Sequence, residues 1–498
     1  MRIFGCLNLG YESTPVEVEA ELRQGLPMIQ IVGYAAVAVR ESADRVRLAL
    51  SNSGFICPQK KIYVNLYPGS VRKESAFLDL AIALKIMERA ELIPSPSISI
   101  MAMGELKLSG EVCRCDGVIA AAAAAAEAGV EILIVSKENQ NEALLSGKGE
   151  IFAVSSLKEA AEIVSRLANG EKPPIATLPV SFEHPESFSG DLSDIVGEPL
   201  LKEALIYAAL GKHHLLLTGP PGCGKTMAIT RLPTLLPDLT EKERLETMRI
   251  YSLAGEIEDD RILTRPPFRA PHHSASPEGI IGGGVGLKPG EISLAHNGVL
   301  FLDEASEFSS VILQALREPL EERRILISRA GIRSRFPADF LLAMAANLCP
   351  CGNRGRANAV CLCSVKEIQR YRNKIGGAIA DRLSIHWKWR SSDAQEADEF
   401  ISESTTSAEI RMKIAEIQKR TTELRGVPNG LLPPNLLKNY CRMSESAETE
   451  FNAYCRRNGL SMRSVINLTR LSLTIADYRG ALRVETVDLH KAFRLRGD

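Results

Sequence analysis

The sequence predicts a multidomain α/β protein with an N-terminal α/β domain, a core built on a parallel sheet, and a helical C-terminal region. Three observations support this fold class. Short β-like runs alternate with helical patterns up to about residue 167, and residues 395–498 show helical patterns throughout. Between them, a glycine-rich turn at residues 219–226 follows an apolar run and precedes a helical pattern. At 498 residues the chain is long enough for several domains, because single cores stop growing near about 250–300 residues.

The composition is that of an ordinary globular protein and gives no overall preference for a charged partner. Lys and Arg total 60 and Asp and Glu total 61, so any basic surface must be local. No apolar run approaches the roughly 20 residues of a membrane helix, and the N-terminus lacks the apolar core of a signal peptide. We therefore expect a cytoplasmic protein without membrane partners. The eleven cysteines favour reduced thiols or a metal site over a disulfide framework.

Strands and helices alternate in the N-terminal region, which we expect to form one α/β domain over residues 1–167. Period-two patterns predict its strands, and 3.6-residue apolar patterns or alanine runs predict its helices. The predicted strands are residues 16–20, 61–66 and 132–135, and the predicted helices are residues 38–51, 77–88 and 120–126. A polar stretch with several prolines, residues 168–190, has the composition of a linker. In the C-terminal region, amphipathic patterns predict helices at residues 408–424, 434–447 and 464–478.

Residues 219–226 have the G-x-x-x-x-G-K-T pattern of a loop that binds nucleotide phosphates. The residues are Gly219, Pro220, Pro221, Gly222, Cys223, Gly224, Lys225 and Thr226. Glycines let backbone N–H groups close around a phosphate, and the N-terminus of the following helix attracts negative charge. Lys225 is expected to reach the β- and γ-phosphates of ATP, and the Thr226 hydroxyl is expected to bind Mg²⁺.

A second apolar run, residues 299–302, ends in Asp303 and Glu304. It predicts a central parallel strand whose carboxyl end carries two acids. Asp303 would hold the Mg²⁺ shell, and Glu304 would polarise the attacking water. Together with the phosphate loop, the two acids predict an ATP hydrolase.

Residues 71–83 and 104–112 resemble the N-terminal domain of the ComM/YifB family, and the resemblance extends over essentially the full chain. These proteins are magnesium-chelatase-like AAA+ ATPases. The resemblance implies an N-terminal domain similar to ribosomal protein S5 domain 2 and to Lon protease domains. It also implies an AAA+ P-loop NTPase core over residues 191–394 and a helical lid over residues 395–498.

The similarity to Lon domains does not extend to the residues of proteolysis. Lon-type proteolysis needs a Ser nucleophile that is activated by a Lys of lowered pKa. On that pattern Phe77 stands at the nucleophile position and Ile119 at the lysine position. Neither side chain can perform this chemistry. We therefore expect a non-proteolytic module that serves oligomer or DNA contacts.

The resemblance assigns two further roles within one subunit. Residues 194–198 resemble the segment that packs beside adenine, with Glu198 where Gln is usual. Asn347 follows an apolar run at residues 340–345 and resembles sensor 1, whose amide holds the lytic water or a γ-phosphate oxygen.

Two arginines complete the ATP site that the resemblance implies. Arg382 resembles the arginine finger, which stabilises the γ-phosphate charge on a neighbouring subunit, although Ser384 replaces the usual Asp nearby. The alternative for Arg382 is a surface salt bridge. Arg463 resembles the sensor-2 arginine and would touch the γ-phosphate of its own subunit. A finger that acts between subunits implies a homo-oligomeric ring, which the family suggests is a hexamer.

Two β-like runs around Ala330-Gly331 predict a basic hairpin over residues 323–335. Its arginines are Arg323, Arg324, Arg329, Arg333 and Arg335. One interpretation is an ordinary solvated hairpin. The other is a hairpin that points into a ring channel and binds DNA phosphates independently of sequence. The resemblance to the pre-sensor-1 hairpin of this AAA+ branch favours the second interpretation.

Two sequence features raise the question of a bound transition metal. Cys349, Cys351, Cys361 and Cys363 form a C-x-C…C-x-C pattern that offers four thiolates for tetrahedral zinc, or four free thiols in a loop. His272 and His273 are adjacent, but neighbouring side chains are expected to diverge and no third ligand is obvious. A structural Zn²⁺ is therefore one of the two interpretations of the cysteines, and we expect no metal at the two histidines.

The family resemblance implies a ring-forming DNA motor that drives ATP-dependent branch migration during natural transformation, acting as a helicase on single-stranded or branched DNA. ATP and Mg²⁺ are the implied cofactors. The alternative is a magnesium-chelatase-like or MoxR-like ATPase that remodels a protein partner. An arginine-rich hairpin favours DNA, because protein-threading rings favour aromatic and hydrophobic pore loops.

Overall fold

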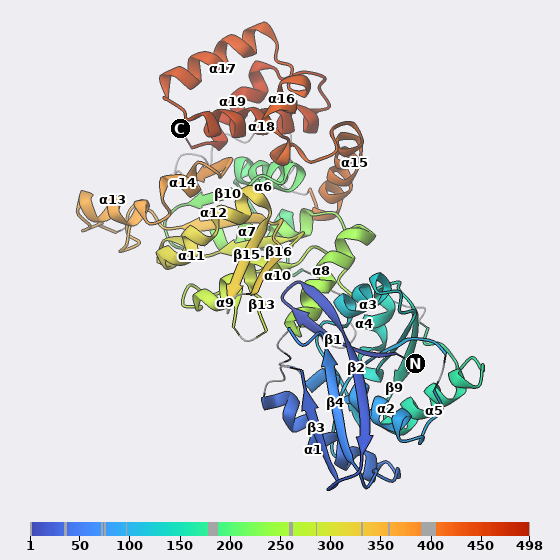
Figure 1. Cartoon of the computed structure of the whole chain (residues 1–498). Coiled ribbons are helices and arrows are strands. Elements are labelled where there is room, and N and C mark those ends of the chain that lie inside the picture. Colours follow the sequence, from blue (N-terminus) through green and yellow to red (C-terminus); the bar gives the residue numbers. More distant parts are fainter. Residues whose placement is uncertain are drawn as a thin grey trace.

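The structure is a computed structural model, and three parts follow one another along it (Figure 1). They are a strand-rich N-terminal part, a central sheet flanked by helices, and a group of C-terminal helices. The structure describes residues 2–33, 37–70, 73, 76–95, 97–177, 188–257, 262–284, 286–329, 332–356, 359–389 and 405–497. Within these ranges, every helix is too short or too polar to cross a membrane. The predicted boundaries at residues 168–190 and 395 fall partly outside the described residues and stay predictions.

The N-terminal part is built on a seven-stranded mixed sheet with the order β3-β4-β2-β1-β5-β8-β9. Its strands are β1 (Ile3–Leu9), β2 (Glu12–Arg23), β3 (Met28–Val32), β4 (Lys61–Tyr67), β5 (Ile100–Met103), β8 (Ile132–Ser136) and β9 (Glu150–Val154). Its helices are α1 (Val37–Asn52), α2 (Asp79–Arg89), α3 (Val118–Glu127), α4 (Gln140–Leu145) and α5 (Leu157–Ala168), and a small hairpin joins β6 (Glu105–Leu106) to β7 (Val112–Cys113). The predicted strands lie in β2, β4 and β8 and the predicted helices in α1, α2 and α3, so these predictions are confirmed.

Helices cover both faces of this sheet, and strand β8 shows the consequence in its side chains. Successive residues of a strand point to opposite faces. Ile132 and Ile134 pack into one buried cluster, while Leu133 and Val135 pack into another. A strand that is buried on both sides reads as a continuous apolar run, which is why this strand was predictable from the sequence.

The central sheet has five parallel strands in the order β11-β14-β17-β10-β18. The strands are β10 (Leu215–Thr218), β11 (Phe268–Arg269), β14 (Val299–Leu302), β17 (Leu341–Ala346) and β18 (Ile385–Lys388). The helices around it are α6 (Pro199–Gly211), α7 (Lys225–Leu235), α8 (Glu241–Ala254), α9 (Pro277–Ile281), α10 (Glu291–Leu294), α11 (Ser310–Ala315), α12 (Arg317–Glu322), α13 (Val365–Asn373) and α14 (Gly377–Ala380). Because parallel strands end at the same edge, the segments after β10, β14 and β17 lie together.

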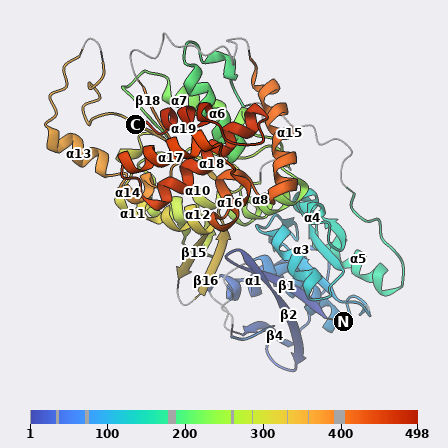
Figure 2. The ribbon, with the colours of Figure 1, turned by 90° about the horizontal axis from the view of Figure 1, so that it is seen from above.

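A hairpin of β15 (Arg324–Arg329) and β16 (Ile332–Pro337) extends from the core toward the N-terminal part in both Figure 1 and Figure 2. The predicted hairpin is therefore confirmed, although its turn residues Ala330 and Gly331 lie outside the described residues. A second short hairpin pairs β12 (Gly282–Gly283) with β13 (Lys288–Pro289).

Tyr11, in the turn between β1 and β2, joins the N-terminal part to this hairpin and to α8. Its backbone N–H donates to the Ser334 hydroxyl at 2.8 Å, and its ring meets Phe336 edge-on at 5.8 Å. Arg249 of α8 lies over the same ring and donates to the Tyr11 carbonyl at 2.8 Å. The base of the hairpin is thus held by the N-terminal part rather than only by the core.

The C-terminal part consists of helices that pack on α6 and α7 of the core. They are α15 (Ser407–Arg425), α16 (Pro434–Tyr440), α17 (Glu445–Arg457), α18 (Met462–Arg479) and α19 (Thr486–Leu495). The predicted helices at residues 408–424 and 464–478 are confirmed as α15 and α18. The prediction of one helix over residues 434–447 is wrong, because α16 ends at Tyr440 and the Ser444 hydroxyl caps a new helix by accepting from the Ala447 N–H.

Candidate nucleotide site

The phosphate loop connects β10 to α7 and holds the Lys225 side chain inside its turn. Gly222 and Gly224 adopt φ values of 83° and 85°, a left-handed conformation that favours glycine. The Lys225 side chain is buried, and its ammonium donates to the carbonyls of Gly219 and Pro220, each at 2.9 Å. Such a buried ammonium above the start of α7 favours a multiply charged anion in the loop.

Strand β17 brings Asn347 to the same lysine. Thr218 of β10 pairs with Ala346 of β17, so the residues that follow each strand meet at one edge of the sheet. The Lys225 ammonium donates to Asn347 Oδ1 at 3.3 Å. The predicted sensor residue therefore lies where it can contact whatever the lysine contacts.

Strand β14 delivers Asp303 and Glu304 beside the start of α7. The Thr226 hydroxyl donates to Asp303 Oδ2 at 2.8 Å, and Asp303 Oδ1 accepts the Glu304 backbone N–H at 2.8 Å. A hydroxyl and a carboxylate oxygen at this separation are hard oxygen donors of the kind that Mg²⁺ prefers, so the pair fits the expected magnesium ion. Glu304 has a φ of 48°, which is uncommon outside glycine and is typical of functional positions.

His273 reaches the same acid, which the sequence did not reveal. Its Nδ1 lies 3.6 Å from Glu304 Oε2. The expectation that His272 and His273 diverge is wrong, because their ring centroids are 4.1 Å apart in a stretch with no regular structure. Divergence of neighbouring side chains holds for helices and strands only. The pair is not part of a group of three or more metal-ligand side chains among the described residues.

Arg382 and Arg463 lie together at the opposite end of the central sheet, the end at which its parallel strands begin. Arg382 precedes β18, whose first residue Ile385 pairs with Leu215, the first residue of β10. The phosphate loop follows the opposite end of β10. Arg382 Nη2 donates to Glu321 Oε1 at 2.6 Å, and the Arg463 guanidinium contacts the same oxygen. This arrangement places Arg463 with Arg382 and away from the phosphate loop of its own chain.

The two arginines belong to a pocket with an excess of positive charge. Its charged lining residues are Lys212, Glu321, Arg323, Arg382, Arg463 and Arg470, and it contains none of residues 219–226. Burial and the nearby Arg323 lower the pKa of Arg470 to about 10. Burial, reinforced by Arg463, also lowers the pKa of Arg382. One carboxylate among five cations leaves this pocket suited to an anion.

Comparisons with known proteins place most of the chain in described families. The family described as "Magnesium chelatase, subunit ChlI" matches residues 191–397, and its C-terminal family matches residues 404–496. A further family, "Subunit ChlI of Mg-chelatase", matches residues 18–139. The protein named competence protein ComM of Haemophilus influenzae is 37% identical over 99% of this chain and 97% of its own length. YifB of Escherichia coli is 34% identical over 94% of this chain and 91% of its own length.

This chain belongs to the ComM/YifB family. Members of this family are AAA+-like ATPases related to magnesium chelatase, so ATP hydrolysis with Mg²⁺ is the chemistry that the family implies for the site. The ATP-site residues predicted from the sequence motifs and from the ComM/YifB resemblance lie in two groups. Lys225, Thr226, Asp303, Glu304 and Asn347 meet at the phosphate-loop edge. Arg382 and Arg463 meet at the opposite edge.

The hairpin of this ComM/YifB family member presents fewer free arginines than the sequence predicted. Arg333 and Arg335 are exposed and share a face with Arg324, because Ser328 pairs with Arg333 and Leu326 with Arg335. Arg324 is engaged by Glu322, with Nη2 2.6 Å from Oε2. Arg329 lies on the other face near the turn. The remaining residue, Arg323, donates to the Leu431 carbonyl at 3.3 Å and lines the basic pocket instead of the hairpin face.

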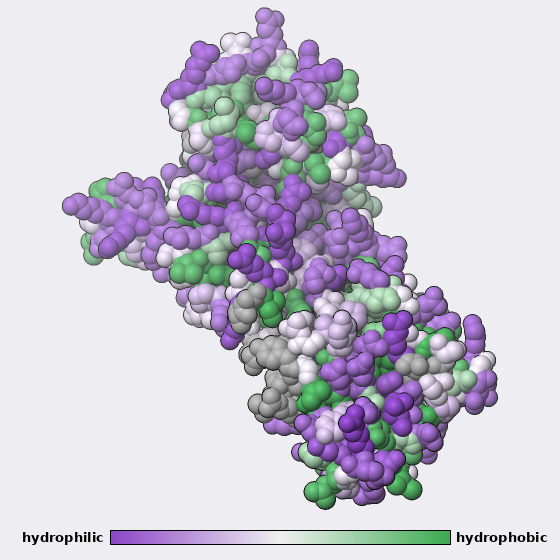
Figure 3. Space-filling view, in the orientation of Figure 1, coloured by the Kyte–Doolittle hydropathy of each residue, from purple (hydrophilic) through white to green (hydrophobic). Residues whose placement is uncertain are grey.

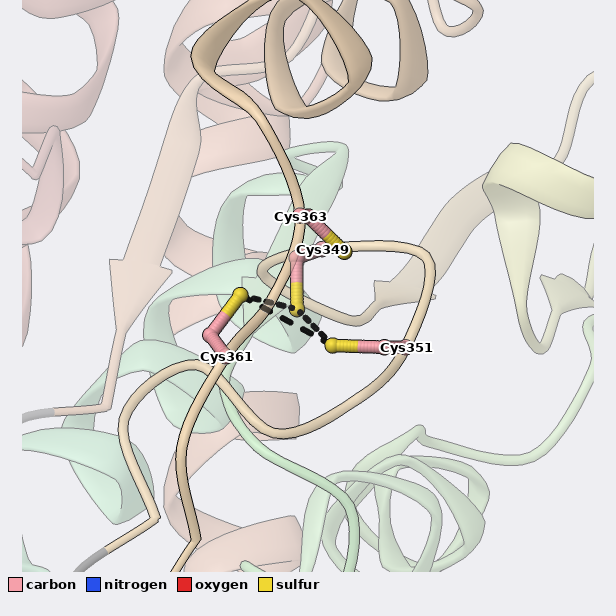
Figure 4. A group of neighbouring side chains, drawn as sticks. All are labelled: Cys349, Cys351, Cys361 and Cys363. Carbon is pink, nitrogen blue, oxygen red and sulfur yellow. Dashed lines mark hydrogen bonds between the residues drawn. The ribbon is translucent and has the colours of Figure 1, made fainter.

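The four cysteines do converge, as Figure 4 shows. Their Sγ atoms all lie within 4.8 Å of one another, and no other group of three or more ligand-type side chains occurs within the described ranges. Hydrogen bonds from the Asn353 backbone and from the neighbouring thiols lower the pKa of Cys351 to about 6.

The buried His213 and the partly buried His214, beside the basic pocket, predict a loss of stability in mild acid. Burial lowers the pKa of His213 to about 3 and that of His214 to about 4 from an ordinary 6.5. The folded state keeps both rings neutral, whereas the unfolded chain gains protons below pH 6.5. Stability that is complete above this pH should therefore fall as the pH decreases toward 4, by up to about 1.4 kcal/mol per pH unit for each histidine.

The measurement is the unfolding temperature of the full chain between pH 7 and pH 5, for wild type and His213→Gln. The His213 ring shares a hydrogen bond of 2.8 Å with Thr474 of α18, so the variant should be less stable at pH 7 but less sensitive to acid. His272→Gln, at an exposed position, should keep the wild-type pH dependence. An unchanged pH dependence in His213→Gln would contradict this assignment.

Proposed function

We propose that this protein is a ring-forming ATPase that moves along DNA and drives branch migration during natural transformation in the cytoplasm. The single observation that carries the DNA part is the hairpin β15–β16, whose exposed Arg333 and Arg335 stand on the same chain as the ATP site. The competence protein name of the Haemophilus influenzae relative supports this choice of pathway.

In this proposal, the phosphate-loop edge binds ATP and directs the attack of water. Lys225 neutralises charge on the transferred phosphate. Asn347, whose Oδ1 accepts a hydrogen bond from the Lys225 ammonium, holds the water or a phosphate oxygen. The Thr226 hydroxyl and Asp303 would hold Mg²⁺, which supplies charge neutralisation at the phosphates. Glu304 orients the water, and His273 beside it restrains the carboxylate until the nucleotide is in place.

A neighbouring copy completes the site, because Arg382 and Arg463 lie at the edge opposite their own phosphate loop. In a head-to-tail ring, each copy presents one edge to the other edge of its neighbour. Both arginines would then leave Glu321 and stabilise the transition-state charge on the adjacent chain. We infer that Arg463 acts on the neighbouring copy together with Arg382, rather than on its own chain. The expected ring is a hexamer.

The hairpin would carry the DNA contact through phosphate charge alone. Arg333 and Arg335 are exposed, and neither forms an ion pair among the described residues. Arginines without acidic partners release counterions when they bind a polyanion, which favours a sequence-independent grip. Helix α13 projects from the core in Figure 1, and its surface in Figure 3 is mostly hydrophilic, with Lys366, Arg370 and Arg372 exposed on it. It offers a second basic surface for the same strand.

We infer that the N-terminal part is a docking module of the S5/Lon type and performs no proteolysis. Phe77 packs partly buried beside an apolar cluster. Ile119 is buried against Met248, Ile250 and Leu294 of the core. These two positions therefore serve packing, and the second one joins the N-terminal part to the ATPase core.

A second candidate is a protein-remodelling ATPase of the magnesium-chelatase or MoxR type. The observation in its favour is that residues 191–397 match the family described as a magnesium chelatase subunit. Such a protein would act on a polypeptide partner, and DNA would not stimulate its ATP hydrolysis.

The test is ATP-driven strand exchange on a labelled three- or four-strand DNA junction. Wild type should exchange strands at the junction. Glu304→Gln should bind ATP and DNA without ATP turnover and leave the junction unchanged. Arg333→Ala/Arg335→Ala should hydrolyse ATP but lose most DNA stimulation and show a weaker salt dependence of DNA binding. Arg324→Ala is the matched control, because Glu322 already engages this side chain. Wild-type ATPase activity without DNA binding would favour the remodelling alternative.

A further inference from the structure

The four cysteines occupy the long loop between β17 and α13. The described residues between β17 and α13 contain no helix or strand. Val360 and Leu362 point outward, at 76% and 89% exposed, although Leu348 at the start of the loop is buried. Loops of this length without secondary structure are uncommon in compact domains, and a cross-link between the cysteines would order this one.

Three of the four sulfur atoms have the spacing of a tetrahedral thiolate site, and Cys363 Sγ lies within 4.8 Å of each of them. Cys349 Sγ lies 3.4 Å from Cys351 Sγ and 3.6 Å from Cys361 Sγ, and Cys351 Sγ lies 3.7 Å from Cys361 Sγ. Zinc–sulfur bonds of about 2.3 Å place the corners of a tetrahedron about 3.8 Å apart. Disulfide bonds would instead require sulfur separations near 2.05 Å.

Apolar packing does not explain the cluster. Cys6 and Cys115 show what a packing cysteine looks like here, because both are buried in an apolar cluster and burial raises the pKa of Cys6 to about 12. In the loop, only Cys349 is buried, while Cys351 is exposed and Cys361 and Cys363 are partly exposed. Burial of apolar surface therefore does not explain why three exposed or partly exposed thiols gather around Cys349.

The backbone around the cluster also suits bound thiolates. The Arg354 N–H donates to Cys349 Sγ at 3.4 Å, and Gly352 has the φ of 72° that a tight turn after Cys351 requires. Backbone N–H donors of this kind stabilise the negative charge of sulfur ligands and fix their orientation. Three of the thiols are accessible to an ion from solvent.

The loop lies directly on the phosphate loop. A Cβ placed on Gly352 would be 2.9 Å from Cγ of Pro221, and one on Gly355 would be 3.8 Å from Cδ of Pro220. Cys349 stands two residues after Asn347, whose side chain accepts from the ammonium of Lys225. Whatever fixes the cysteines therefore also fixes one wall of the ATP site.

We propose that Cys349, Cys351, Cys361 and Cys363 bind one structural Zn²⁺, which clamps the loop against Pro220 and Pro221 and thereby positions Asn347. The metal takes no part in phosphate transfer, because all four of its ligands come from the protein and no position stays open. The proposed zinc binding does not depend on the proposed DNA function. The proposed clamping of the loop rests only on the proposed ATP hydrolysis.

The first experiment measures zinc in full-length protein purified without chelator, by elemental mass spectrometry. We expect about one zinc per chain in wild type, and less than about a tenth of that in Cys361→Ser/Cys363→Ser. Cys57→Ser/Cys455→Ser, which changes two cysteines outside the cluster, should keep the wild-type content. Wild type that neither contains zinc nor takes it up from added zinc salt would overturn the proposal.

Two further measurements do not depend on the folding of a variant. Titration of wild type with a mercurial thiol reagent should release zinc to a colorimetric chelator as the cluster reacts. Wild type refilled with Co²⁺ should show the visible absorption of tetrahedral thiolate-bound cobalt. Release of no zinc, or an octahedral cobalt spectrum, would count against a four-thiolate site.

The clamping half is tested by ATP hydrolysis in the same samples, without DNA. Zinc-depleted protein should hydrolyse ATP about tenfold more slowly and recover when zinc is restored. Zinc-depleted protein that hydrolyses ATP at the wild-type rate would overturn the clamp while leaving the metal site intact. A lack of hydrolysis in zinc-replete wild type would instead contradict the proposed ATPase function.

Discussion

Lys225→Ala is expected to reduce ATP hydrolysis by about 10²–10³-fold, the cost of removing one buried group that stabilises charge in a phosphoryl-transfer site. The reason is the position of the ammonium inside the loop, where the Lys225 side chain is only 7% exposed and contacts Asn347. Charge in so enclosed a place is worth more than charge in water. Nucleotide binding should weaken as well, because the same ammonium attracts the phosphates of bound ATP.

The measurement combines steady-state ATP hydrolysis with binding of a fluorescent ATP analogue. Lys419→Ala, on the exposed side of α15, is the matched control and should leave both quantities unchanged. Thermal unfolding shows whether the variant is folded, since the carbonyls of Gly219 and Pro220 lose a donor. Near-normal hydrolysis by folded Lys225→Ala would contradict the assignment of the phosphate loop.

Arg382→Ala is expected to lower ATP hydrolysis by about 10³-fold or more, the usual effect of losing an arginine finger, while ATP still binds. The stronger prediction concerns mixtures. Arg382→Ala keeps an intact phosphate loop, and Lys225→Ala keeps an intact Arg382. Equal amounts of the two should recover roughly a quarter of the wild-type rate, because random mixing creates that fraction of complete interfaces in a head-to-tail ring.

Recovery requires that the arginine act between copies, so the mixture separates this role from a structural one. Two arginine variants mixed together, Arg382→Ala with Arg463→Ala, should show no recovery if both arginines enter the same neighbouring site. Arg483→Ala is a suitable control, because this arginine is exposed and its one ion pair among the described residues is with nearby Glu485. Mixed assemblies that form and yet stay inactive would show that Arg382 does not act on its neighbour.

Local features of the chain were predictable because they depend on neighbours in sequence. The turn of residues 219–226 needs its glycines for the backbone alone, and Gly222 and Gly224 adopt the expected left-handed conformation. The strand that ends at Asp303 is an uninterrupted apolar run, as a buried parallel strand requires. The break between α16 and α17 was missed because the Ser444 cap interrupts an amphipathic pattern that otherwise continues.

The basic hairpin shows a different kind of limit. Its two strands follow from alternation, and their pairing is confirmed. Which arginines face solvent depends on register and on neighbours that the pattern does not contain. Arg323 turns toward Leu431 of the C-terminal part, and Arg324 is engaged by Glu322, so only three of the five predicted arginines stay on the hairpin without an acidic partner among the described residues.

The sequence by itself determined the phosphate loop, the acids after β14 and the four-cysteine pattern, because each is a local string whose chemistry follows from residue type and spacing. Tertiary structure alone decided which of these sequence segments lie in contact. Parallel pairing of β10 with β17 brings Asn347 to Lys225, and pairing of β10 with β18 places Arg382 at the far edge. It also set Arg463 beside Arg382 on one carboxylate, and His273 beside Glu304. Such contacts join residues far apart in the chain, and their energies depend on strand order, which no local pattern encodes.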